Sequence, residues 1–173
     1  MQYTIKPTHT HPPEERGFTI VEILAVLAII GVIAAVVFPR LSFLEGHYLR
    51  SDARRVSGLV HYVSETASIK KLYYRLLFDI EGGTITIESS VNGTDYAEVP
   101  DADLRRLRLR DGIEIEDLLL PRIGRINEGA IAVHFSPYGF AEPFTLHMKG
   151  GGNLLTLSFN PYNGKVRVSE GYG

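Results

Sequence analysis

The hydropathy pattern of this chain begins with one continuous apolar run. From Phe18 to Phe38 the run carries a single charge, Glu22, and a single hydroxyl, Thr19. A helix of this length extends about 30 Å at about 1.5 Å per residue, which matches the hydrocarbon core of a bilayer. The pattern therefore predicts a transmembrane helix over residues 18–38.

Beyond this run the apolar residues recur at spacings of three and four, which is typical of one face of an amphipathic helix. We expect this stripe to pack on a core; a coiled-coil seam is the alternative. Pro39 should remove the hydrogen bond to the carbonyl of Ala35, so that the helix is kinked or loosened where the apolar run ends. The stripe consists of Leu49, Ala53, Val56, Val60, Val63 and Ala67.

From Lys71 onward the apolar period changes to two, which indicates β-strands. The pair Gly82-Gly83 favours a two-residue hairpin loop. That loop predicts two cross-strand pairs, Ile80 with Ile85 and Phe78 with Ile87.

A second hairpin is predicted over residues 107–115. A two-residue Asp-Gly loop would set Leu109 opposite Glu114, whereas a three-residue loop with Gly112 left-handed sets Leu109 opposite Ile113 and Arg108 opposite Glu114. The three-residue loop is therefore preferred. Residues 91–103, between the hairpins, are expected to be a loop.

The C-terminal third predicts a meander of four strands whose apolar residues share one face. The expected pairs are Ile131, Val133 and Phe135 with Phe144, Leu146 and Met148; these with Leu155, Leu157 and Phe159; and finally Phe159 with Val166 and Leu157 with Val168. Gly150-Gly151-Gly152 is interpreted as a turn rather than a phosphate-binding loop.

These elements together predict an α+β fold. One long N-terminal helix, transmembrane in its upper half and amphipathic in its lower half, packs on antiparallel β-sheet hairpins and the C-terminal meander. The expected organisation is a leader at 1–17, the helix at 18–38 and a folded domain at 39–173.

The amino-acid composition excludes several classes of functional site. The chain of 173 residues has no cysteine, which excludes disulfides and thiolate chemistry. Its 18 Lys and Arg residues are nearly balanced by 20 Asp and Glu residues. The chain therefore has no strong positive charge that would favour nucleic acid as a partner. No catalytic constellation or cofactor motif stands out, and we expect a protein that is not an enzyme and holds no cofactor.

Two groups of side chains merit a test as binding sites. His134 and His147 are expected on one polar sheet face within reach of a single metal, but no third ligand is evident and a solvated pair is preferred. The basic run of Arg105, Arg106, Arg108 and Arg110 is expected to pair across the second hairpin with Glu114, Glu116 and Asp117. Nucleic-acid binding is the less favoured reading.

The charge inside the apolar run and the position of a processing signal are unusual. A buried carboxylate such as Glu22 costs about 2.5–3.5 kcal/mol at the centre of a bilayer, and less near its surface. The candidate signal, Arg16-Gly17 followed by Phe18, precedes the apolar run, whereas a secretory signal is cut after its apolar region. A cut there would leave the helix on the mature chain.

This segment resembles the type IV pilins and the pseudopilins of type II secretion. The resemblance rests on Gly17-Phe18-Thr19-Ile20-Val21-Glu22, the apolar residues that follow as far as Ala35, and Pro39-Arg40-Leu41. It implies that a prepilin peptidase cuts after Gly17 and methylates the Phe18 amine, and that Glu22 and Pro39 serve assembly.

The C-terminal pattern, Phe135-Ser136-Pro137-Tyr138-Gly139 and later Phe159-Asn160-Pro161-Tyr162-Asn163-Gly164-Lys165-Val166, is similar to that of H-type minor pseudopilins and T-type minor pilins. The resemblance implies a structural subunit of a periplasmic pseudopilus, anchored by one pass in the inner membrane. The implied partners are the assembly platform, the major pseudopilin and other minor pseudopilins. The presence of Glu22 argues against the K-type tip subunit.

Three other functions stay open. The first is a minor type IV pilin involved in pilus assembly or DNA uptake, and the second is a DNA-binding minor pilin that acts through the arginine hairpin. A membrane-anchored periplasmic enzyme is the third, and it has no evident site.

Overall fold

A computed structural model describes residues 19–101 and 105–172, except for the side chains of 38–45. The chain divides into two compact units, Met1–Phe38 and Pro39–Gly173. Helix α1, Ile20–Lys70, contributes to both, and each unit is considered by itself.

The described part of the first unit is the apolar start of α1. Ile20–Val37 has a mean hydropathy of 3.0 and none of it is buried against the rest of the protein. By length and composition this segment is able to cross a membrane. Its exposed apolar side chains require lipid or other helices around them.

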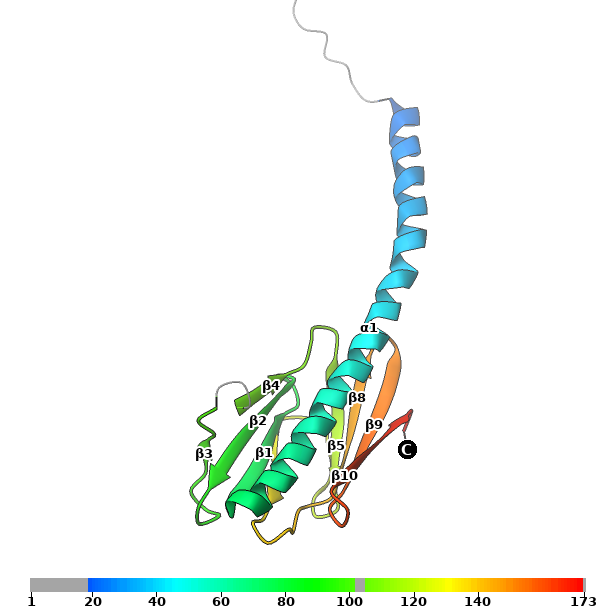
Figure 1. The fold of residues 1–173 in the computed structure, drawn as a ribbon. Helices are drawn as coiled ribbons and strands as arrows, with labels where there is room; N and C mark the ends of the chain where they lie inside the picture. The colour runs from blue at the N-terminus through cyan, green and yellow to red at the C-terminus, as the bar shows by residue number, and fades with distance from the viewer. Residues whose placement is uncertain (1–18, 102–104, 173) are drawn as a thin grey trace, which may run out of the picture. The chain divides into compact units, whose positions relative to one another are not determined.

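In the residues that the structure describes, the second unit contains ten strands in two antiparallel sheets of five strands each (Figure 1). One sheet has the order β3-β2-β1-β7, with β4 also paired to β2, and the other has the order β10-β9-β8-β5-β6. The α+β fold class is confirmed. The strands are β1 Tyr73–Asp79, β2 Thr84–Ser90, β3 Ala97–Glu98, β4 Arg106–Arg108, β5 Glu114–Leu120, β6 Gly124–Ile126, β7 Ala130–Phe135, β8 Phe144–Gly150, β9 Asn153–Asn160 and β10 Lys165–Glu170.

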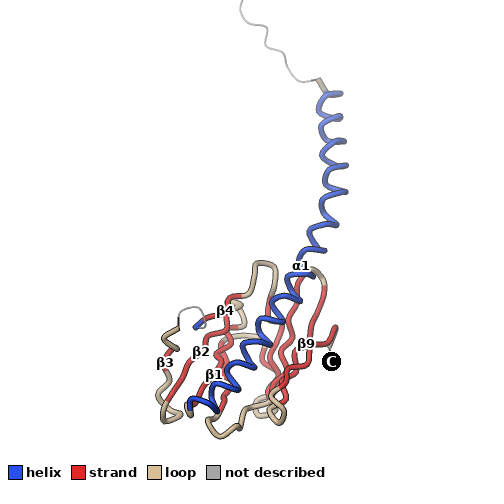
Figure 2. Tube along the Cα trace, in the orientation of Figure 1, coloured by secondary structure: helices blue, strands red, loops and turns tan. Residues whose placement is uncertain are grey.

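One hydrophobic core joins the lower part of α1 to both sheets. The helix lies across the strands of the second unit in Figure 2. All six residues of the predicted helical stripe are buried in this core, so the core-facing interpretation is confirmed and the coiled-coil alternative is not needed. From the sheets the core takes large side chains such as Phe78, Leu118 and Leu157, each fully buried. Two sheets lie under one helix because each presents an apolar face that must be covered.

The predicted register of the last three strands is confirmed. Strand β8 pairs with β9, with Phe144 opposite Phe159, Leu146 opposite Leu157 and Met148 opposite Leu155. Strand β9 pairs with β10, with Phe159 opposite Val166 and Leu157 opposite Val168. Short turns leave little choice of register here, because a one-residue slip would expose every apolar side chain.

The predicted register of the first hairpin is wrong by two residues. Phe78 pairs with Ile85 and Leu76 with Ile87, so four residues form the turn. The Asp79 carboxylate accepts the Gly82 N–H at 3.0 Å, which stabilises the wider turn. Ile80 instead donates its N–H to the carbonyl of Gly129. A shift of two residues keeps the same side chains on the buried face.

Two predicted strand pairings are also wrong. Residues 107–115 do not form a hairpin, because β4 pairs with β2 while β5 pairs with β8 in the other sheet. Gly112 is left-handed as expected, with φ of 83°, but its turn passes the chain from one sheet to the other. Similarly, β7 pairs with β1 rather than β8. The expected loop at 91–103 contains the short strand β3, and its residues 102 and 103 lie outside the described residues.

Gly58→Ala should stabilise the protein. Gly58 is an exposed residue within α1, and a Cβ there would have no neighbour within 4 Å. Alanine should therefore raise the free energy of unfolding by about 0.5–1 kcal/mol through helix propensity alone. Urea unfolding of the full chain in detergent measures this.

The matched variant Gly150→Ala should act in the opposite direction. Its Cβ would lie 2.4 Å from Ile113 Cδ1 and 3.2 Å from the Gly112 carbonyl oxygen, so it should lower stability by about 1–3 kcal/mol. Equal unfolding midpoints for the two variants would contradict this packing.

Candidate functional site

The N-terminal end of α1 is capped by its own sequence. The Glu22 N–H donates to Thr19 Oγ1 at 3.2 Å, and a threonine followed three residues later by a glutamate is the pattern of a capping box. A carboxylate in the first turn also complements the positive end of the helix dipole. Glu22 thus favours the helix start independently of any role in assembly.

Most of the other residues expected to direct processing and assembly lie outside the part of the chain that the structure describes. Gly17 and Phe18 lie outside the described residues, so the cut and the methylation stay predictions. Pro39 falls within the bounds of α1, but its side chain lies outside the described ones and the expected kink stays a prediction. Glu22 is the one expected site residue whose side chain the structure describes, and it is exposed.

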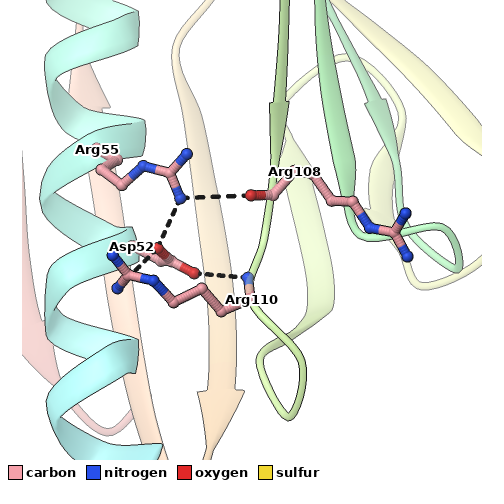
Figure 3. Close-up of polar contacts among 4 residues, drawn as sticks. All are labelled: Asp52, Arg55, Arg108 and Arg110. Carbon is pink, nitrogen blue, oxygen red and sulfur yellow. Dashed lines mark hydrogen bonds and ion pairs between the residues drawn. The ribbon is translucent and has the colours of Figure 1, made fainter.

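The second unit contains a buried carboxylate that the sequence analysis missed (Figure 3). Asp52 is fully buried. Its Oδ2 accepts the backbone N–H of Arg110 at 2.8 Å, and its Oδ1 accepts from Arg55 Nη1 at 2.9 Å. Arg110 Nη1 also lies 3.4 Å from Oδ1. The carboxylate therefore attaches helix α1 to the turn that connects the two sheets.

The local sequence explains this position. Asp52 lies between Leu49 and Ala53 on α1, so it belongs to the buried side of the helix. Arg55 follows by three residues, the spacing at which helical side chains meet. An aspartate within an apolar stripe was the available signal, because a carboxylate is rarely buried unless it is paired.

A second buried pair corrects an expectation about histidines. His147 Nδ1 lies 2.5 Å from Asp117 Oδ1, both residues are buried, and the ring of Tyr172 lies 4.5 Å from that of His147. His134 instead lies in the other sheet, half-exposed and 3.9 Å from Glu142. The two histidines are thus neither a solvated pair nor neighbours around one metal.

Of the basic run, Arg105, Arg106 and Arg110 are paired, but not with the carboxylates expected. Arg105 and Arg106 contact Glu98 of β3 at 3.5 and 3.1 Å, and Arg110 contacts Asp52. Glu114 and Glu116 instead bind Lys149, whose pKa is raised because both carboxylates, Glu116 foremost, accept hydrogen bonds from it. The guanidinium of Arg108 extends away from Asp52 (Figure 3).

The comparisons with known proteins concern a motif near the N-terminus and the fold of the chain. Residues 13–38 match the prokaryotic N-terminal methylation motif. No curated protein sequence matches the chain.

The fold of the chain is similar to that of the minor pseudopilin EpsH from the type 2 secretion system of Vibrio cholerae. One structure of EpsH is 16% identical over 70% of this chain and 96% of that chain, with a TM-score of 0.55. A crystal structure of EpsH is 15% identical over 73% of this chain and 97% of that chain, with a TM-score of 0.60. The chain therefore shares the fold of EpsH over nearly the whole EpsH chain.

Proposed function

We propose that this chain is an H-type minor pseudopilin, a non-enzymatic structural subunit of the periplasmic pseudopilus of a type II secretion system. The observation that carries the proposal is the combination of two features in one chain. A methylation motif occupies residues 13–38, and 70–73% of the chain has the fold of EpsH along nearly the whole EpsH chain.

The apolar segment of α1 gives a physical reason for this proposal. Its side chains are exposed in the isolated chain, so they are stable either in lipid or against other apolar helices. A subunit that moves from the membrane into a helix-packed filament exchanges one apolar surrounding for another. The same segment therefore serves as an anchor before assembly and as a packing surface after it.

The proposal specifies a location and a set of partners. The prepilin peptidase cuts after Gly17 and methylates Phe18, and the helix holds the chain in the inner membrane with the domain 39–173 in the periplasm. The assembly platform then adds the subunit to a filament of the major pseudopilin and other minor pseudopilins. Pro39 makes the helix pliable where it leaves the membrane.

Processing is the first test. Mass spectrometry of the mature protein should show a chain that begins with N-methylated Phe18. Gly17→Val should leave a full-length precursor, because the peptidase requires a small side chain next to the cut bond. Gly31→Val, a matched change farther along the helix where a Cβ has open space, should be cut normally. An intact leader on the wild-type protein would reject the proposal.

A secretion assay distinguishes the pseudopilus from a pilus. Deletion of the gene should abolish export of the substrates of type II secretion, and the wild-type chain but not Gly17→Val should restore it. Normal export together with a loss of pili or of DNA uptake would assign the chain to a minor type IV pilin instead.

A further inference from the structure

The Asp52 site contains more positive charge than its carboxylate neutralises. One buried carboxylate contacts two guanidiniums, those of Arg55 and Arg110, whose side chains are 44% and 41% exposed. Asp111, in the same turn, makes no ion pair with either arginine among the residues that the structure describes. A structural attachment of α1 to the turn needs a single cation, so the second is in excess.

Both guanidiniums are held in place while part of their hydrogen-bonding capacity faces solvent. Arg55 Nη1 donates to Asp52 and also lies 3.3 Å from the Arg108 carbonyl oxygen. The Arg110 guanidinium lies 5.3 Å from the ring centre of Tyr48. Each guanidinium has five N–H donors, so donors remain for a ligand. Such fixed donors lose less conformational entropy on binding than free side chains do.

Two tyrosine side chains of α1 lie on the same flank of the helix as Arg55. Tyr48, Arg55 and Tyr62 follow at intervals of seven residues, two helical turns, and therefore lie along one flank of α1. Tyr48 and Tyr62 are 43% and 37% exposed. Tyrosine and arginine, together with tryptophan, are enriched at the energetic centres of protein interfaces. This flank combines both with a fixed excess of positive charge.

We propose that this flank, formed by Tyr48, Arg55, Tyr62 and Arg110, binds a carboxylate side chain of a neighbouring filament subunit. The inference rests on the proposed function, since a filament built on packed N-terminal helices brings the flanks of α1 against other subunits. A planar guanidinium pair matches a carboxylate through charge-assisted hydrogen bonds.

A protein carboxylate fits this flank better than a polyanion does. The chain as a whole has a formal net charge of −2, and the nearby Arg105 and Arg106 are engaged by Glu98. Nucleic acid requires several free cations in a row. The excess at this site is one charge, which one carboxylate neutralises.

Photo-crosslinking in cells tests the inference on the full chain. A photoreactive phenylalanine analogue at position 62 should give an adduct with another filament subunit, and the captured peptide should contain an Asp or Glu. Arg55→Glu should reduce the adduct by about fivefold to tenfold, because like charges then oppose each other. Changing the captured carboxylate to arginine should restore the adduct to Arg55→Glu.

Matched variants separate this role from folding. Arg54→Glu makes the same change of charge one residue away, at an exposed position, and should leave the adduct unchanged. Arg55→Gln removes the charge without reversing it and should give a smaller loss, in a protein whose urea midpoint is measured alongside.

Three results would overturn the inference. They are an adduct insensitive to Arg55→Glu, a captured peptide without an acidic residue, and an adduct with phospholipid alone. The same analogue at Val26, in the apolar segment, reports on the filament itself. Adducts from position 26 without adducts from position 62 reject this inference alone, whereas an absence of subunit adducts from both positions rejects the proposed function.

Discussion

Replacing Glu22 with alanine should leave a chain that is processed and stably inserted but fails to register in the filament. Before assembly the Glu22 carboxylate lies about 6 Å along the helix from Phe18, close enough to the membrane surface to be hydrated. Packing among apolar helices removes that water, and an unpaired charge then costs several kcal/mol. The cut after Gly17 creates a cation at the Phe18 amine. Because the helix directs this amine away from its own Glu22, we expect the carboxylate to pair with the amine of a neighbour.

Loss of this pair should reduce cross-links between the chain and the major pseudopilin by at least about tenfold relative to wild type, a difference of about 1.4 kcal/mol. Two controls separate pairing from helix formation. Thr19→Ala removes the side-chain cap of the Glu22 N–H and should weaken the helix start by about 1 kcal/mol while keeping the carboxylate. Glu22→Gln keeps the size of the side chain and loses the charge, so it should resemble alanine. Undiminished cross-links in Glu22→Ala would show that the carboxylate does not guide assembly.

Asp52→Ala should produce the largest loss of stability among single changes at the polar sites of the second unit. It removes the acceptor of the Arg110 backbone N–H and of the Arg55 guanidinium. We expect a loss of about 2–4 kcal/mol, because a partly buried donor is left unpaired and a cavity forms in the core. That is a large fraction of the 5–15 kcal/mol typical of a domain. Urea unfolding of the full chain in detergent, followed by tyrosine fluorescence, measures it.

The matched variants make this prediction specific. Asp52→Asn retains an oxygen that accepts the Arg110 N–H but loses the charge, so about half of the effect should remain. Asp111→Ala removes an exposed carboxylate from the same turn and should change stability by less than about 0.5 kcal/mol. If Asp52→Ala unfolds at the wild-type midpoint, the carboxylate does not hold α1 to the turn.

The sequence alone predicted the structure correctly where the deciding interactions join residues that are close in the sequence. The apolar run, the six buried residues of the helical stripe and the β8-β9-β10 register all follow from periodicity and short turns. The same periodicity also identified which side chains are buried in β1 and β2, although it placed their register two residues away. Periodicity reports the buried face of an element, and a shift of two residues leaves that face unchanged.

The choice of partner strand was decided only by the tertiary structure. Residues 107–115 alternate like a hairpin, and β7 alternates like a neighbour of β8, yet each lies beside a strand distant in sequence. In two sheets under one helix, several strands have the same alternation of apolar residues and could pair with a given strand. Which strands pair depends on filling one common core, a property of all the elements together.

The polar sites also divide into those that the sequence determined and those that only the tertiary structure decided. The sequence by itself determined the apolar helix, its motif, Glu22 and the site expected for the cut, because these lie within one continuous segment. The pairs of Asp52 with Arg110 and of Asp117 with His147 join residues 58 and 30 positions apart. Such pairs have no period in the sequence, and they exist because folding removes water from a carboxylate and leaves a distant donor as its partner.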